Sequence, residues 1–159
     1  MSEIVVLDAV SVATIARAVR DLCDSTRKSA PVPLEIMPET VADAVRACGE
    51  PPLSEARREV LRRYATELDE IAEVAVSLDQ HEHEIEHQLR WWGERADALQ
   101  ARLTGHPGDD VDTVRELALY RGRMSGATTM RRHYAQQRVA LVERHRRADA
   151  LCAEQLTEP

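Results

Sequence analysis

The chain has 159 residues, lacks phenylalanine and is only 3% aromatic, so its core must be built mainly from Leu, Val, Ala, Ile and Met. Charged residues make up 31% of the sequence, as is typical of long solvated helices. A net charge of −7 disfavours a nucleic-acid-binding protein, because phosphate repels an acidic molecule. No apolar run approaches the roughly 20 residues needed to cross a bilayer, so we expect no membrane span.

Two short helices are predicted in residues 1–50. Over residues 8–26 the apolar residues follow helical spacing, with Asp8 or Ser11 as the N-cap. The preceding IVVL has strand character but no second strand to pair with. The segment PVPLEIMP, residues 31–38, predicts an extended linker, because each proline restricts its neighbour. A second helix is expected between Pro38 and Gly49, in the usual Pro-first, Gly-last order.

A heptad repeat runs through residues 54–104 and predicts a long helix that packs lengthwise on a partner helix. Its inward positions alternate spacings of three and four residues, and Glu82 is the one charged member. TGHPGDD then ends this helix, and Asp109 or Asp110 caps a second helical stretch, residues 110–155. The seam comprises Leu61, Tyr64, Leu68, Ile71, Ala75, Leu78, Glu82, Ile85, Leu89, Trp92, Ala96, Leu99 and Leu103.

The predicted fold is all-α: a single domain, residues 1–159, in which two shorter N-terminal helices pack on a long antiparallel hairpin spanning 54–155. The distribution of charge supports a turn near 105–110. Residues 67–86 hold eight acidic residues and no Lys or Arg, whereas 121–147 hold eight arginines and one acid. Folding at this turn brings residue i close to about residue 215 − i, which pairs the two stretches. Such pairs set helix orientation, so the arginines favour a structural role over nucleic-acid binding.

The stretch HEHEIEHQLRWWG, residues 81–93, contains the candidate metal ligands His83, Glu84 and His87. Imidazoles four residues apart on a helix bind Zn²⁺ or Ni²⁺. Glu84 and His87 also have the ExxH spacing of di-iron bundles, but no second ExxH is present. In the heptad frame all three residues point to solvent, so we favour a solvated helix face, with a surface metal site as the alternative.

Glu82 differs from these residues because it lies in the seam. The expected register places His133, Arg132 or Arg131 opposite it. A buried carboxylate must be paired, and such a pair often fixes register. We therefore predict that Glu82 forms an ion pair with His133 or Arg132.

Trp91-Trp92-Gly93 satisfies the motif W-x-G. Over residues 54–155 the chain resembles the small WXG-type proteins of type VII (ESX) secretion, which are helical hairpins from GC-rich bacteria. A single lysine and the absence of Asn and Phe also indicate a GC-rich genome. The resemblance implies a secretion-associated protein with W-x-G at its turn. The family's YxxxD/E signal is absent, since Leu68, Met124 and Arg138 lie four residues after the three tyrosines.

Helix packing is the alternative explanation of the two tryptophans. Trp92 belongs to the seam, where Gly122 and Gly126 are expected to let the helices approach closely. Trp91 lies outside the seam and either covers the N-terminal helices or anchors a partner, since Trp is favoured at binding hot spots. Trp91 and Trp92 are therefore the candidate partner-binding residues.

The sequence contains no catalytic motif, so we predict no enzyme activity, no catalytic residue and no cofactor. The expected function is that of an interaction, adaptor or assembly protein that binds a protein partner or a second copy of itself. A type VII secretion-associated protein and a metal-binding bundle using His83, Glu84 and His87 are the alternatives. Three cysteines without CxxC spacing and no signal peptide predict a cytoplasmic protein, with signal-independent secretion as the other route.

Overall fold

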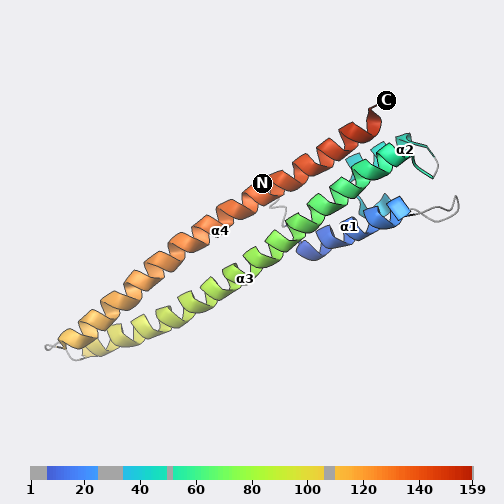
Figure 1. Ribbon diagram of the computed structural model, residues 1–159. Helices are drawn as coiled ribbons and strands as arrows, with labels where there is room; N and C mark the ends of the chain where they lie inside the picture. Colours follow the sequence, from blue (N-terminus) through green and yellow to red (C-terminus); the bar gives the residue numbers. More distant parts are fainter. Residues whose placement is uncertain (1–6, 25–33, 50–51, 106–109, 159) are drawn as a thin grey trace. The chain divides into compact units, whose positions relative to one another are not determined.

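The computed structural model describes residues 7–24, 34–49, 52–105 and 110–158. It contains the helices α1 (Ala9–Asp24), α2 (Glu39–Ala47), α3 (Glu55–Gly105) and α4 (Val111–Thr157), and a short 3-10 helix, η1 (Leu34–Ile36) (Figure 1). Over these ranges the chain forms no strand. The all-α prediction is confirmed: α3 packs against α4 as a hairpin, and the shorter helices pack on them. The IVVL segment lies mostly outside the described residues, as do 106–109 of the predicted turn.

Local sequence explains where the helices begin and end. The Asp8 carboxylate caps α1 by accepting hydrogen bonds from the N–H groups of Val10 at 3.3 Å and Ser11 at 3.2 Å. In the same way Asp110 caps α4 by accepting from the N–H of Thr113 at 3.1 Å. Gly49 follows α2 with φ +94°, a left-handed conformation that glycine adopts without steric cost. Asp8, rather than Ser11, thus caps α1, and Asp110 caps α4, while Asp109 lies outside the described residues.

The extended linker predicted for residues 31–38 is wrong at residues 34–36, which the structure describes. Leu34–Ile36 form a turn of 3-10 helix, and the Met37 N–H donates to the Leu34 carbonyl at 3.2 Å. No proline lies between residues 34 and 37 to prevent this turn, and it carries Met37 into the core. Residues 31–33 lie outside the described ranges.

The chain divides into two compact units: unit 1 comprises residues 1–76 and 138–159, and unit 2 comprises residues 77–137. The core of unit 1 forms where four helices meet. Its largest fully buried side chains come from α1, α2, α3 and α4 alike: Val19, Val41, Leu61, Leu68, Ile71 and Leu156. The single-domain organisation predicted for 1–159 stays a prediction.

Unit 2 consists of the facing segments of α3 and α4 and has a thinner core. Eight of its described residues are buried, against twenty-four in unit 1. A cluster of Ala96, Leu99, Leu117 and Tyr120 forms its centre, and Trp92 and other half-buried side chains pack against it. The heptad seam of α3 is confirmed, because every seam residue from 61 to 103 is buried or half-buried.

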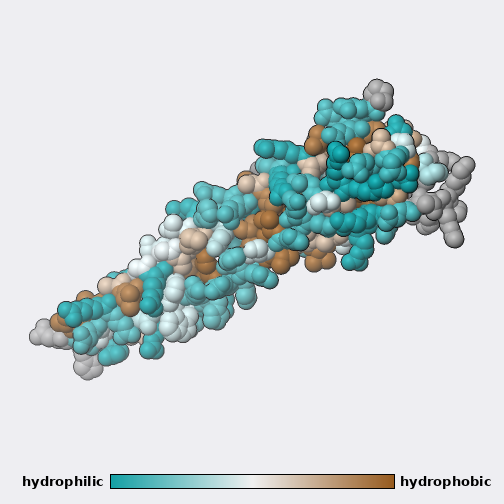
Figure 2. Space-filling model, in the orientation of Figure 1, coloured by the Kyte–Doolittle hydropathy of each residue, from teal (hydrophilic) through white to brown (hydrophobic). Residues whose placement is uncertain are grey.

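The apolar residues of α4 do not all lie on one face. Val111, Val114, Met130 and Leu151 are 43–57% exposed. Thr113, Ala127, Cys152 and Leu156 are buried instead. Leu117, Leu141 and Leu156 are also buried, so large apolar residues lie on both the inward and the outward face of α4. Hydrophobicity alone therefore does not mark its packed face. Figure 2 accordingly shows hydrophobic residues exposed among hydrophilic ones on the visible surface. The helix continues through 122–126 without a break.

Candidate functional site

An arginine on α4 joins the acidic stretch of α3 to the basic stretch of α4 within unit 1. The Arg144 guanidinium donates to both Glu67 carboxylate oxygens at 2.5 and 2.9 Å, and to Glu70 at 2.6 Å. These two carboxylates, Glu67 first, raise the pKa of Arg144. The predicted complementarity between the two helices is confirmed at this point.

Reversing this charge should destabilise the fold. We expect Arg144→Glu to lower the free energy of unfolding by about 1 kcal/mol, because it replaces a solvent-screened ion pair with a cluster of like charges. Denaturation by urea, followed by circular dichroism, measures the change. Adding Glu67→Arg should recover most of the loss. The control is Arg147→Glu, since Arg147 has no ion pair within the described ranges. Equal effects of the two single variants would contradict the assignment.

A polar group missed by the sequence analysis lies between α3 and α4 in unit 1. The Tyr64 hydroxyl donates to Asp149 Oδ1 at 2.7 Å, and His145 Nε2 lies 3.7 Å from the same oxygen. The Asp149 side chain is only 16% exposed, and its burial raises the pKa of the carboxyl. His145 Nε2 is buried without a hydrogen-bond partner among the described residues. The seam position of Tyr64 was the one available signal, because a buried hydroxyl needs a partner.

An open groove of about 740 Å³ lies beside this group, between α3 and α4 of unit 1. Val60, Ala148 and Leu151 give it apolar walls, and charged residues, among them Arg63 and Arg147, line the rest. No sequence motif indicated this groove, because its lining depends on which face of α4 packs against α3.

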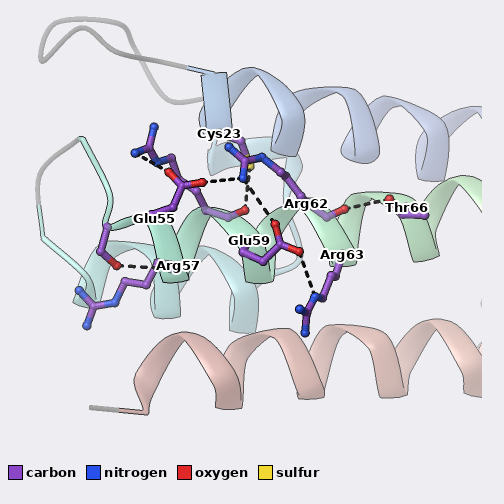
Figure 3. Close-up of polar contacts among 9 residues, drawn as sticks. Cys23, Glu55, Arg57, Glu59, Arg62, Arg63 and Thr66 are labelled. Carbon is purple, nitrogen blue, oxygen red and sulfur yellow. Dashed lines mark hydrogen bonds and ion pairs between the residues drawn. The ribbon is translucent and has the colours of Figure 1, made fainter.

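At the start of α3, charged residues form a ladder of surface contacts (Figure 3). Arg62 pairs with Glu55 at 2.8 Å, and Arg63 pairs with Glu59 at 3.2 Å. These ion pairs join residues four or seven positions apart on one helix. They therefore stabilise α3 and do not indicate a binding site. The thiol of Cys23 reaches the same turn and donates to the Arg58 carbonyl at 3.6 Å (Figure 3).

All three cysteines are free thiols. Burial raises the pKa of Cys152 to about 12 and raises the pKa of Cys23 as well. A thiol with a raised pKa stays protonated at neutral pH and reacts slowly. The structure therefore gives Cys23 and Cys152 a packing role.

The predicted metal residues His83, Glu84 and His87 are exposed on α3. Glu84 accepts a hydrogen bond from the Gln88 amide at 3.2 Å. Within the described part of the chain, no group of three or more His, Cys, Asp or Glu side chains is placed to hold a metal ion. His81, the first histidine of the stretch 81–93, packs against α4, since its ring stacks on that of Tyr134 with centroids 5.3 Å apart.

The structure places Glu82 half-buried in the seam, with Arg132 and His133 exposed on α4. His133 accepts a hydrogen bond from the Gln137 amide at 3.0 Å, and its ring centroid lies 6.0 Å from that of Tyr134. The ion pair of Glu82 with His133 or Arg132 stays a prediction.

The two tryptophans differ in burial. The heptad frame placed Trp92 in the seam and Trp91 outside it, but left the burial of Trp91 open. Trp92 is half-buried and packs on the core cluster of unit 2. Trp91 is 49% exposed, and the edge of its ring meets Tyr120 with centroids 5.9 Å apart. The Arg123 guanidinium lies 5.9 Å from the centre of the same Tyr120 ring. The exposed Trp91 and Arg123 therefore both contact the buried ring of Tyr120, and these three residues are called the patch below.

The expected role of the α4 glycines is wrong. Gly122 and Gly126 are exposed, and a Cβ atom at either would meet nothing within 4 Å, so neither lets the helices approach. Their positions face away from α3 because the inward face here is set by Tyr120, Met124 and Ala127. Gly93 is the glycine that faces the other helix, since a Cβ atom added to it would lie 3.8 Å from Met124 Cε. Gly93 lies inside α3, so W-x-G is not at the turn.

Neither a protein family, nor a curated protein, nor a solved structure matches this chain. No helix of the described residues is long and apolar enough to cross a membrane.

Proposed function

We propose that this chain is a non-enzymatic helical interaction protein that presents the exposed Trp91 and Arg123, both in contact with the buried ring of Tyr120, to a protein partner or a second copy. The observation that carries the proposal is the half-exposed indole of Trp91 beside an aromatic ring and an arginine. Trp, Tyr and Arg are the residues most enriched at the energetic centres of protein interfaces. An exposed Trp in this setting is therefore better explained by binding than by packing.

The thin core of unit 2 supports the same proposal. Two helices alone bury one stripe each, and most helical stability in proteins comes from packing of apolar faces. Apolar side chains on the uncovered faces of this unit include Leu119, 52% exposed, and Met130, 43% exposed. A partner that covers these residues would supply burial that the hairpin lacks.

Affinity purification of the full chain from extract of its source cells, followed by mass spectrometry, tests the proposal. We expect specific co-purifying protein, lost in Trp91→Ala and retained in the control Val10→Ala. Val10 is 72% exposed and lies on α1 in unit 1, so it reports on loss of an exposed apolar side chain elsewhere. Retention of every bound protein by a folded Trp91→Ala variant would overturn the proposed role of the patch.

A further inference from the structure

The groove of about 740 Å³ between α3 and α4 of unit 1 has an arginine on each of its two walls. Arg63 comes from α3 and Arg147 from α4, and both are exposed. Figure 3 shows the Arg63 side chain extending from α3 toward α4. The hydrogen bond of Tyr64 to Asp149 fixes the register of the two helices here. At a rise of about 1.5 Å per residue, the two arginines therefore lie within about 5 Å of each other along the helix axes.

Both guanidinium groups have donors that the fold does not use. Arg147 has no hydrogen bond or ion pair within the described ranges. The hydrogen bond of Arg63 to Glu59 uses the Nε atom alone, at 3.2 Å, and the Arg63 side chain is 75% exposed. Neither Glu59 nor Asp149 lines the groove. The Nη groups of the two arginines can therefore donate to an acceptor that enters between them.

The charges that line the groove favour a ligand with one negative charge. The other charged lining residues are Arg144, Glu67 and Glu143. Both carboxylates are already paired, Glu67 with Arg144 at 2.5 Å and Glu143 with Arg146 at 2.9 Å. Three arginines against two glutamates give the lining a net charge of +1. A carboxylate matches this charge better than a phosphate monoester, which carries about −1.5 to −2 at neutral pH.

An apolar surface begins beside the arginine pair and continues toward the C-terminal end of α4. Ala148 and Leu151 of α4 and Val60 of α3 form it, over a floor that includes the buried Cys152. Leu151 is 53% exposed, so nothing in the described chain covers its side chain. The α4 lining ends at Gln155, about 12 Å beyond the arginine pair. The groove therefore has a cationic site at one point and an apolar surface that extends from it.

We infer that this groove binds a fatty-acid-like molecule, an aliphatic chain with a single carboxylate. The carboxylate lies between Arg63 and Arg147 and accepts charge-assisted hydrogen bonds from both. The chain lies over Val60, Ala148 and Leu151. The volume of the groove is within the range of about 300–1,000 Å³ that is typical of small-ligand sites. An acidic helix of a partner protein fits less well, because its charges would extend along the groove whereas the unpaired donors lie at one level.

Titration of the isotope-labelled full chain with octanoate, followed by NMR at neutral pH, tests the inference. We expect saturable shifts of amide signals from the groove, among them those of Arg63, Ala148 and Leu151. Octanol has the same chain without the charge and should bind at least tenfold more weakly. Butyrate should also bind at least tenfold more weakly, because it lacks four methylene groups that octanoate buries, at about 0.8 kcal/mol each.

Removing either free guanidinium should weaken the site. We expect Arg63→Gln and Arg147→Gln each to raise the dissociation constant for octanoate about tenfold, the effect of losing one hydrogen bond to a charged group. Arg17→Gln is the matched control, because Arg17 is an exposed arginine of α1 that does not line the groove. It should leave the dissociation constant unchanged, and the NMR spectra show whether each variant is folded.

The absence of saturable octanoate binding, equal binding of octanol, or unchanged affinity in a folded Arg147→Gln variant would overturn the inference. Two further results would assign the groove to another occupant and overturn it as well. One is a shift of the same signals when the protein concentration alone is raised, which would indicate a second copy. The other is saturable binding of an acidic amphipathic peptide where octanoate has no effect, which would indicate a protein partner.

Discussion

Leu68→Ala is expected to lower the free energy of unfolding by about 2–5 kcal/mol, the range observed when a buried leucine is truncated. Leu68 is completely buried in the seam of α3, in the densely packed unit 1. The loss combines the transfer free energy of the removed methyl groups with the cavity left behind. Urea denaturation followed by far-UV circular dichroism measures it.

The control for Leu68→Ala is Leu151→Ala, the same change on α4 of unit 1 at a side chain that is 53% exposed. We expect a change of roughly 0.5 kcal/mol or less, as for most surface substitutions. A comparable loss in both variants would show that Leu151 is covered in solution, and would contradict the burial assigned to the two faces of α4.

Tyr64→Phe should lower the free energy of unfolding by about 1–3 kcal/mol at neutral pH, the cost of leaving a buried polar group without its hydrogen bond. The hydroxyl it removes is the donor to the Asp149 carboxylate. The control is Tyr134→Phe. The ring of Tyr134 stacks on His81, and no hydrogen bond of its hydroxyl occurs within the described residues, so we expect little change.

The deficit of Tyr64→Phe should shrink as the pH is lowered. Burial raises the folded-state pKa of Asp149 above 3.8, so its protonated form favours the folded chain. That contribution is complete below the unfolded pKa and is lost as the pH rises through the folded pKa. The Tyr64 hydrogen bond lowers the folded pKa, so its removal makes the loss larger in the variant. Unfolding free energies at pH 7 and pH 4 measure the difference. Equal deficits at the two pH values would contradict a charged, hydrogen-bonded Asp149.

The sequence predicted α3 better than α4 for a physical reason. In α3 the large apolar residues occupy the positions that face other helices, so Leu61, Leu68 and Ile71 mark the core directly. In α4 the inward positions carry Thr113 and Ala127 while Val111 and Val114 point outward, so hydrophobicity does not show its orientation. What located α4 was the charge distribution, which the contact of Arg144 with Glu67 confirms.

The candidate patch was partly predictable. The heptad frame separated Trp92 from Trp91, because consecutive side chains lie about 100° apart around a helix and only Trp92 occupies a seam position. Tyr120 as the third member, and Arg123 over its ring, depend on the rotation of α4, which the sequence left undetermined. The hydrogen bond from Tyr64 to Asp149 could not be predicted for the same reason. An aspartate on a helix is expected to be exposed, and only the packed face of α4 shows that Asp149 is buried.

Both tryptophans of the chain lie in unit 2, and unit 1 has none. Indole emission therefore reports the loss of structure in one unit alone, whereas the far-UV signal of the helices comes from both. Because α3 runs through both units as one continuous helix, loss of helical structure in one unit can propagate along α3 into the other. Coincident fluorescence and circular dichroism transitions would mean that this helix makes unfolding all-or-none, and separated transitions would mean that the thinner unit unravels first.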